Sequence, residues 1–245
     1  NNIYLSTNFM RIAIDISSID SSKAGVGYYT LELVKALLNE DSLNNSYFLL
    51  TNEKNSINCL SGEVRYEFIE IKNRRANIFW ILKSYFILRK KKIDILISPS
   101  NFTFGILFRN TIQTIHDLAP IKHPEFFSRK ASFMYKFLLD LYLRRAKIIV
   151  TSCEPTYDDI IEYYPRVKEK LFITGVGLHE WAKKTISKED DIKVSKKYNL
   201  PRYYFLSVGT LEPRKNHINM IKAYSLFLKK KPEYYYLIVG KKGWF

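Results

Sequence analysis

The sequence predicts an α/β protein with a doubly wound parallel sheet, and two observations support this prediction. Short apolar runs alternate with longer segments of helical periodicity, and runs such as RIAIDI at residues 11–16 have the character of strands buried on both faces. The expected strands are residues 11–16, 47–51, 66–71, 93–97, 111–115, 147–151 and 171–174, and the expected helices lie near residues 28–38, 78–92 and 130–145. Strands that alternate with helices form parallel βαβ units, with helices on both faces of the sheet.

Two of the expected helices carry an apolar stripe that should face the sheet. In the first helix the stripe consists of Leu33, Val34, Leu37 and Leu38. In the helix at residues 130–145 we expect Phe133, Phe137, Leu138 and Leu141 to form the packing face.

The chain is expected to contain one domain and the beginning of another. Residues 1–9 read as an upstream extension before a natural start at Met10, residues 10–180 as the first domain, and residues 181–200 as the crossing. Residues 201–245 contain a strand at 203–208, a helix at 216–230 and a strand at 235–239. One βαβ unit cannot bury both faces of its own sheet, so we expect the second domain to be incomplete.

Composition excludes some classes of protein. The hydrophobic content of 47% is enough for a sizeable core, yet no uncharged apolar run reaches the length of about 18 residues that a spanning helix needs. Cys59 and Cys153 lie far apart without CxxC spacing, which argues against a disulfide framework or a zinc site and fits a reducing cytoplasm.

The net charge of +15 is compatible with a nucleic acid, an anionic membrane surface or a compositional drift towards lysine. The segment from Arg74 to Lys92 combines aromatic residues with basic ends. It fits a core helix with a solvated tail, and it also fits a peripheral element that meets anionic lipid.

The segment VGTLEPRKN at residues 208–216 follows a strand and opens a helix. Gly209 allows close backbone approach, and Arg214 and Lys215 precede the positive end of the helix dipole. A guanidinium, an ammonium and helix amides together suit a diphosphate, although a solvated basic loop would show the same residues.

Two further segments are expected at the carboxyl edge of the sheet, where open α/β sheets bind ligands. Gly25 and Gly27 lie in a loop after the first strand, which is either a tight turn or the lining of a cleft, and the third glycine of GxGxxG is missing. His116 and Asp117 follow the strand at residues 111–115, and such a pair is either a local cap or a catalytic unit.

The order of these motifs resembles the GT-B glycosyltransferases of family 4, the group 1 glycosyltransferases. The landmarks are RIAIDIS, AGVGYYT, TIHDL, HPEFF, RAKIIVTS, VGTLEPRKN, the AY pair and IVGKKGW, which together extend over residues 10–245. The resemblance implies two Rossmann-like domains, of which the second is represented by its first βαβ unit and is truncated at its C-terminal side.

The resemblance also implies an activity and assigns roles to residues. The intact enzyme would retain anomeric configuration while transferring a mannose-like or glucose-like hexose from a nucleotide diphosphate sugar to a glycan or lipid-linked acceptor, in cell-surface polysaccharide synthesis. Arg214 and Lys215, with Gly209, would bind the donor diphosphate, and Gly25 and Gly27 would line the cleft.

His116 would contact the donor sugar in that reaction, while Asp117 would fix the loop or assist the acceptor. The resemblance implies neither a metal nor another cofactor. The family's paired-glutamate motif would lie beyond residue 245, so the chain alone is expected to be inactive.

Two positions depart from the family pattern, and two other functions are alternatives to a glycosyltransferase. Cys153 interrupts the usual serine-glutamate-x-serine turn, and Gly177 stands where an aspartate is common. The rivals are a non-catalytic nucleotide-sugar or glycan-binding module and a nicotinamide-dependent oxidoreductase, and the missing GxGxxG argues against the second. The resemblance favours a membrane partner over nucleic acid, and a cytoplasmic protein peripheral to the inner face of the membrane.

Overall fold

The computed structural model describes residues 9–19, 25–52, 66–71, 78–100 and 107–243. The chain forms two compact units, Asn1–His179 and Glu180–Phe245, and each is described by itself.

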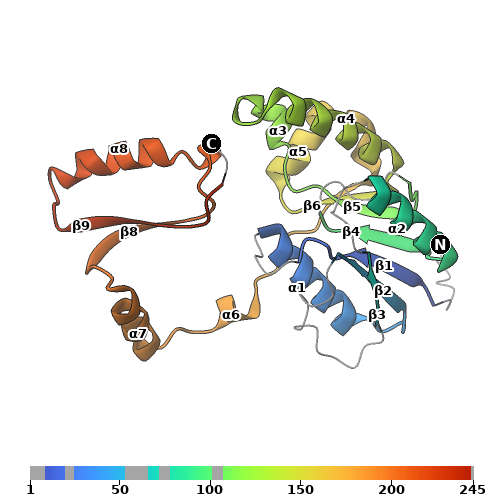
Figure 1. The fold of residues 1–245 in the computed structure, drawn as a ribbon, viewed down its shortest axis with the longest axis horizontal. Coiled ribbons are helices and arrows are strands. Elements are labelled where there is room, and N and C mark those ends of the chain that lie inside the picture. The colour runs from blue at the N-terminus through green and yellow to red at the C-terminus, as the bar shows by residue number, and fades with distance from the viewer. Residues whose placement is uncertain (1–8, 20–24, 53–65, 72–77, 101–106, 244–245) are drawn as a thin grey trace. The chain divides into compact units, whose positions relative to one another are not determined.

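Within the described part of the first unit, seven strands form one sheet (Figure 1). The strands are β1 Arg11–Asp15, β2 Ser46–Thr51, β3 Tyr66–Glu70, β4 Ile95–Ser98, β5 Thr111–Thr114, β6 Ile148–Thr151 and β7 Leu171–Ile173. Their order is β3-β2-β1-β4-β5-β6-β7, and every neighbouring pair is parallel. The prediction of a doubly wound parallel sheet is confirmed, and the strand order reverses between β1 and β4.

The helices of the first unit cover both faces of this sheet. They are α1 Gly25–Glu40, α2 Ile78–Lys90, α3 Ala119–Lys122, α4 Arg129–Arg145 and α5 Glu154–Tyr163, with the short 3-10 turns η3 Pro124–Phe126 and η4 Pro165–Lys170. α1 packs on Ile12 and Ile14 of β1, whereas α2 packs in a cluster with Ala13, whose side chain points to the other face. α4 and α5 share the face of α2 (Figure 1).

The first helix begins earlier than the sequence predicts. Gly25 and Gly27 were expected in a loop before residue 28, but both belong to the first turn of α1, so the loop prediction is wrong. The amide groups of a first helical turn have no intrahelical partner, and glycine therefore costs less there than in a helix interior. Leu31, Val34 and Leu38 are the large apolar residues that α1 buries.

The packing face of α4 also differs from the prediction. Phe133 and Phe137 are 73% and 54% exposed, whereas α4 buries Leu139, Tyr142 and Leu143. Leu138 and Leu141 are half-buried at the border between the two faces. Both stripes have helical spacing, and burial against α5 and β6 selects the second one.

The second unit contains α6 Glu180–Lys183, α7 Lys188–Tyr198, β8 Tyr203–Val208, η5 Pro213–Lys215, α8 His217–Leu228 and β9 Tyr234–Val239 (Figure 1). β8 and β9 are parallel and pair along their whole length. Phe205, Leu206 and Val239 are 45%, 53% and 54% exposed, although parallel sheets normally have both faces covered.

The corrected face of α4 makes a testable prediction about stability. We expect Leu139→Ala to lower the free energy of unfolding by about 2–5 kcal/mol, because it leaves a cavity at a fully buried position. Phe133→Ala should change it by less than about 0.5 kcal/mol, since that side chain is exposed. Urea denaturation followed by circular dichroism measures both values. A larger loss of unfolding free energy for Phe133→Ala than for Leu139→Ala would support the packing face that the sequence predicts.

Candidate functional site

The carboxyl edge of the first sheet brings together the start of α1 and the segment after β5. Both follow parallel strands, and the ring of Tyr29 in α1 meets the ring of His116 edge-on at a centroid distance of 4.9 Å. The expectation that the Gly25–Gly27 segment and His116 lie at the same edge of the sheet is therefore confirmed.

The imidazole of His116 is held by a backbone carbonyl. Its Nε2 lies 2.8 Å from the carbonyl oxygen of Pro99, which only accepts hydrogen bonds, so Nε2 carries the proton. Burial lowers the pKa of His116 below its ordinary value of 6.5, against the smaller opposing effects of the Pro99 carbonyl and Asp117. At neutral pH the ring is therefore uncharged, and Nδ1 carries the acceptor lone pair.

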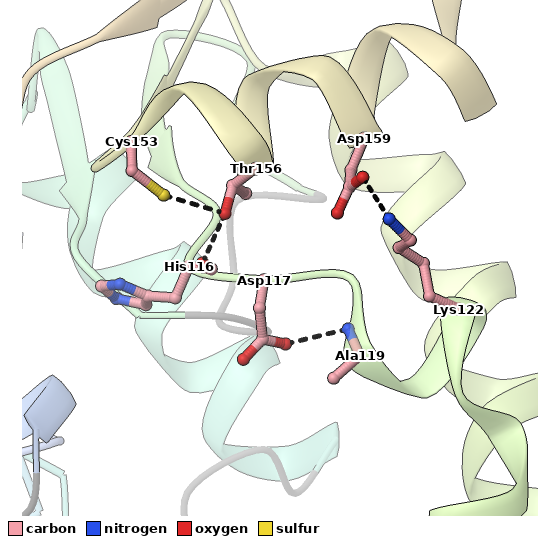
Figure 2. Close-up of polar contacts among 7 residues, drawn as sticks. All are labelled: His116, Asp117, Ala119, Lys122, Cys153, Thr156 and Asp159. Carbon is pink, nitrogen blue, oxygen red and sulfur yellow. Dashed lines mark hydrogen bonds and ion pairs between the residues drawn. The ribbon is translucent and has the colours of Figure 1, made fainter.

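Hydrogen bonds from α4 and α5 fix the backbone around His116 and Asp117, and Figure 2 shows the one from α5. Thr156 of α5 donates from Oγ1 to the carbonyl of His116 at 3.2 Å, and the Tyr135 hydroxyl donates to the carbonyl of Asp117 at 2.7 Å. Burial raises the pKa of Tyr135, which keeps this hydroxyl a donor. The segment is thus anchored from both α4 and α5.

The carboxylate of Asp117 has a local contact. Its Oδ1 accepts a hydrogen bond from the amide of Ala119 at 3.1 Å, which caps the turn into α3 (Figure 2). Lys122 at the end of α3 forms an ion pair with Asp159 of α5. These contacts give Asp117 a role in shaping the loop, and its catalytic role, like that of His116, stays a prediction.

Cys153 lies at the turn that departs from the family pattern. Its Sγ is 3.4 Å from Oγ1 of Thr156, and this hydrogen bond is the main effect that lowers the pKa of the thiol (Figure 2). The residue precedes α5, a helix that the sequence analysis missed because few of its residues are apolar. Pro155 in the first turn was the available signal.

A cavity of about 280 Å³ opens at the same edge of the sheet. α1 contributes Tyr28 and Glu32 to its lining, and the segment after β7 contributes residues 174–177 and His179. Nε2 of His179 lies 3.3 Å from a carboxylate oxygen of Glu32. Gly25 lines this cavity and Gly27 is buried, so the two glycines do not have the same environment.

Asp15 is a buried carboxylate that the sequence analysis did not single out. It ends β1, and its Oδ1 accepts hydrogen bonds from the amide and the hydroxyl of Ser17 at 3.0 and 2.6 Å. Its Oδ2 is buried and has no hydrogen-bond partner in the part of the chain that the structure describes. The position at the carboxyl end of a strand beside the reversal of strand order was the signal that could have identified it.

Arg214 and Lys215, the two basic residues predicted to bind the diphosphate, lie in the single turn η5 before α8. Arg214 donates from Nε and Nη2 to Oε1 of Glu212 at 3.0 and 2.8 Å, and Glu212 is 5% exposed. Glu212 orients the guanidinium, and this residue was not predicted from the sequence. Lys215 ends η5, and Asn216 adopts a left-handed conformation with φ 56° before α8 begins.

Close backbone approach holds Gly209 beside this turn. A Cβ on Gly240 would lie 1.7 Å from the carbonyl oxygen of Gly209, so only glycine fits there. The Cε of Lys215 lies 3.6 Å from the position that a Cβ on Gly209 would take. Gly209 and Lys215 thus lie close together, and the role of Gly209, Arg214 and Lys215 in binding a diphosphate stays a prediction.

The helix α2 has one buried and one exposed face. Trp80, Ser84 and Leu88 are fully buried, whereas Phe79 and Phe86 are 69% and 67% exposed. The outward hollow of about 630 Å³ is lined by Phe79, Leu82, Lys83, Phe86, Ile87 and Lys90. Of the basic residues predicted to meet a membrane, Lys91 is paired with Glu67, and Arg74 and Arg75 lie outside the described residues.

Neither a metal cluster nor a spanning helix is found where the structure describes the chain. No group of three or more His, Cys, Asp or Glu residues there could hold a metal ion. In the same residues, no helix is both long enough and apolar enough to cross a membrane.

Comparison with known proteins identifies the family. The model of Glycosyltransferase Family 4 matches residues 24–174, and the model of Glycosyl transferases group 1 matches residues 188–245. The chain belongs to glycosyltransferase family 4. The predicted relationship is confirmed.

Relatives of this member of glycosyltransferase family 4 include two O-antigen enzymes. The O-antigen chain mannosyltransferase RfbU of Salmonella typhimurium is 29% identical over 154 residues, which are 61% of this chain and 39% of that protein. The O-antigen chain mannosyltransferase B of Escherichia coli is 25% identical over 169 residues, 67% of this chain and 42% of that protein. The chain thus spans about two fifths of the length of these relatives.

A solved structure shows the same fold. The crystal structure of HepE from Anabaena, in complex with UDP and glucose, matches with a TM-score of 0.63 and 14% identity, over 97% of this chain and 62% of that one. The GT-B fold of this family 4 glycosyltransferase is thereby confirmed.

The neutral state of His116 gives a prediction about pH. Because burial lowers its pKa, the unfolded chain binds a proton that the folded chain excludes, and stability should fall as pH drops below about 6.5. Above the ordinary pKa of histidine, His116 is neutral in both the folded and the unfolded chain, so the full free energy of unfolding is retained. Titration of the imidazole nitrogens by NMR, with His116→Gln to assign the signal, should give a pKa below 6.5 and Nε2 as the protonated nitrogen. A pKa above that value would contradict the prediction.

Proposed function

We propose that the full-length protein is a retaining glycosyltransferase of cell-surface polysaccharide synthesis. It transfers a hexose from a nucleotide diphosphate sugar to a glycan or lipid-linked acceptor. The observation that supports this most is the turn before α8, where Glu212 orients Arg214 beside Lys215 in the unit that matches the group 1 glycosyltransferases.

The comparisons favour mannose as the hexose within this proposal. RfbU and mannosyltransferase B are both named as O-antigen mannosyltransferases, and WbdA of Escherichia coli, 28% identical over 134 residues, is a serotype-specific mannosyltransferase. The HepE structure holds UDP and glucose, which makes a glucose donor the second choice.

The proposed chemistry places positive charge where the leaving diphosphate becomes negative. Arg214 and Lys215 would stabilise that charge, and the first amides of α8 add the positive end of a helix dipole. The acceptor would attack from the same side as the leaving phosphate, which assists it, so that configuration is kept. No metal or other cofactor has a part in this proposal.

In the first unit, His116 would bind the donor sugar. With Nε2 protonated, its Nδ1 can accept a hydrogen bond from a sugar hydroxyl without adding charge. Asp117 would hold the loop that carries His116, through its contact with Ala119. Gly25 and Gly27 would let the start of α1 approach the ligand.

The alternative is a non-catalytic module that binds nucleotide sugars or glycans. The exposed apolar faces of β8 and β9 favour it for the 245-residue chain, because the basic turn lies on a sheet that is not covered. We therefore propose that this chain alone has no appreciable turnover.

A donor experiment on the full-length protein tests the proposed function. We expect product from a nucleoside diphosphate mannose donor and an O-antigen-type acceptor. Arg214→Ala and Lys215→Ala should each weaken binding of the nucleoside diphosphate about 10- to 150-fold, which corresponds to one charged hydrogen bond. Lys222→Ala, which removes the same charge from an exposed position on α8, is the control.

Calorimetric titration of these variants separates the two functions. Weakened diphosphate binding with unchanged acceptor affinity supports the donor role of Arg214 and Lys215. Wild-type affinity for the nucleoside diphosphate in both variants would indicate that the two residues belong to a solvated loop and do not bind the diphosphate. Binding without turnover by the full-length protein would favour the non-catalytic module.

We further propose that the enzyme is cytoplasmic and peripheral to the inner face of the membrane, through the outer face of α2. Phe79 and Phe86 are exposed there, and Lys83 and Lys90 line the same hollow. Aromatic rings that enter the lipid interface and ammonium groups that meet anionic headgroups are a common pair of membrane contacts.

The membrane proposal predicts sedimentation with anionic vesicles. We expect binding to fall as salt rises, because screening weakens the attraction of lysine to the surface. Phe79→Ser with Phe86→Ser should reduce binding, and Phe133→Ser, an exposed phenylalanine on α4, should not. Equal sedimentation with neutral and anionic vesicles would contradict the prediction.

A further inference from the structure

A basic cavity lies at the amino edge of the first sheet, opposite the edge that carries His116. Its volume is about 560 Å³, and it is formed by the end of α2, the segment before β5 and the end of α4. The polar and charged lining residues are Tyr85, Arg89, Lys92, Arg109, Asn110 and Arg145. As far as the structure describes this lining, it contains four cationic side chains and no carboxylate.

Helix ends explain only half of this charge. Arg89 and Arg145 lie in the last turns of α2 and α4, where cations stabilise the negative end of the helix dipole. Lys92 follows the end of α2, and Arg109 precedes β5, so neither belongs to a helix. Like charges that line one cavity repel one another, and an anion bound in the cavity would offset this repulsion.

The backbone of Lys92 is a second and independent observation. Its φ is 50°, in the left-handed region, and the amide of Ile93 donates to the carbonyl of Leu88 at 3.1 Å, as at a glycine-capped helix end. The other non-glycine residues with positive φ in the described chain are all asparagines: Asn44, Asn199 and Asn216. A lysine is unfavourable in this conformation, and glycine or asparagine would end α2 at lower cost.

We propose that this cavity binds a phosphate group, at a site separate from the donor diphosphate. The guanidinium groups of Arg89, Arg109 and Arg145 provide forked donors, and Lys92 provides a point charge. The amide of Asn110 adds a neutral donor. The strained position of Lys92 is thereby explained by what its side chain contributes to the cavity.

We expect no chemical step at this phosphate, because the cavity and His116 lie at opposite edges of the sheet. The central strands β1, β4, β5 and β6 have four to five residues, so the two edges of the sheet lie roughly 15 Å apart at about 3.3 Å per residue. The phosphate belongs to a lipid headgroup or to a soluble phosphate compound, since both present the same oxygens to the cations.

Two substitutions test the site without disturbing the core. Lys92→Gly removes the charge and relieves the left-handed backbone, so the melting temperature should stay the same or rise. Arg109→Ala removes a cation from an exposed loop position. Lys184→Gly is the control, because it makes the same change as Lys92→Gly at an exposed position outside the cavity.

The probes are inorganic pyrophosphate, measured by calorimetry, and phosphatidylcholine vesicles with and without phosphatidic acid, measured by sedimentation. We expect Lys92→Gly and Arg109→Ala each to weaken binding of at least one probe about 5-fold, and Lys184→Gly to leave it unchanged. Neither Lys92 nor Arg109 belongs to the turn proposed to bind the donor diphosphate, so we assign a loss in these variants to the basic cavity.

The pattern of loss identifies the source of the phosphate. Loss confined to vesicles with phosphatidic acid supports a lipid headgroup, and loss of pyrophosphate binding supports a soluble phosphate. Equal binding of both probes by the three variants and the unchanged protein would overturn the proposal. A lower melting temperature for Lys92→Gly would overturn the argument from its backbone.

Discussion

The parallel pairing of β1 with β4 is the interaction on which the arrangement of the first unit depends. Ile12, Ala13 and Ile14 pair with residues 95–97, and the chain turns to opposite sides from this central pair. Parallel ladders align the carboxyl ends of all strands. Asp15 and His116 consequently share one edge, although 101 positions separate them in the sequence, and the basic cavity lies at the other edge.

A neutral imidazole and a cluster of cations lie at opposite edges of this sheet. At the carboxyl edge burial keeps the imidazole of His116 neutral, and a backbone carbonyl fixes its tautomer. At the amino edge four cations line one cavity. Composition alone could attribute the excess of basic residues to drift or to an anionic partner. In this cavity, four of these residues lie around one space. These opposite environments suit the two ligands that we propose, sugar hydroxyls at the edge with His116 and a phosphate at the edge with the basic cavity.

The accuracy of the sequence predictions follows the kind of information that each one used. Strands were found within a few residues because their apolar runs are local and continuous, and the basic turn before α8 was found because Arg214 and Lys215 adjoin a helix start. The role of Glu212 was missed, since a carboxylate near an arginine in sequence shows neither its burial nor its contact. Asp15 was predicted only as part of a strand, because the sequence does not show that its side chain is buried.

The sequence by itself determined the order of the strands along the chain, the family and the neighbourhood of the basic turn, because periodicity and short motifs are local properties. Only the tertiary structure decided that α4 buries Leu139 and exposes Phe133, and that Lys92 and Arg109 line one cavity. Helical spacing predicts which residues share a face of the helix. Whether that face is buried depends on elements that are distant in the chain. A cavity between three such elements exists only after they have packed.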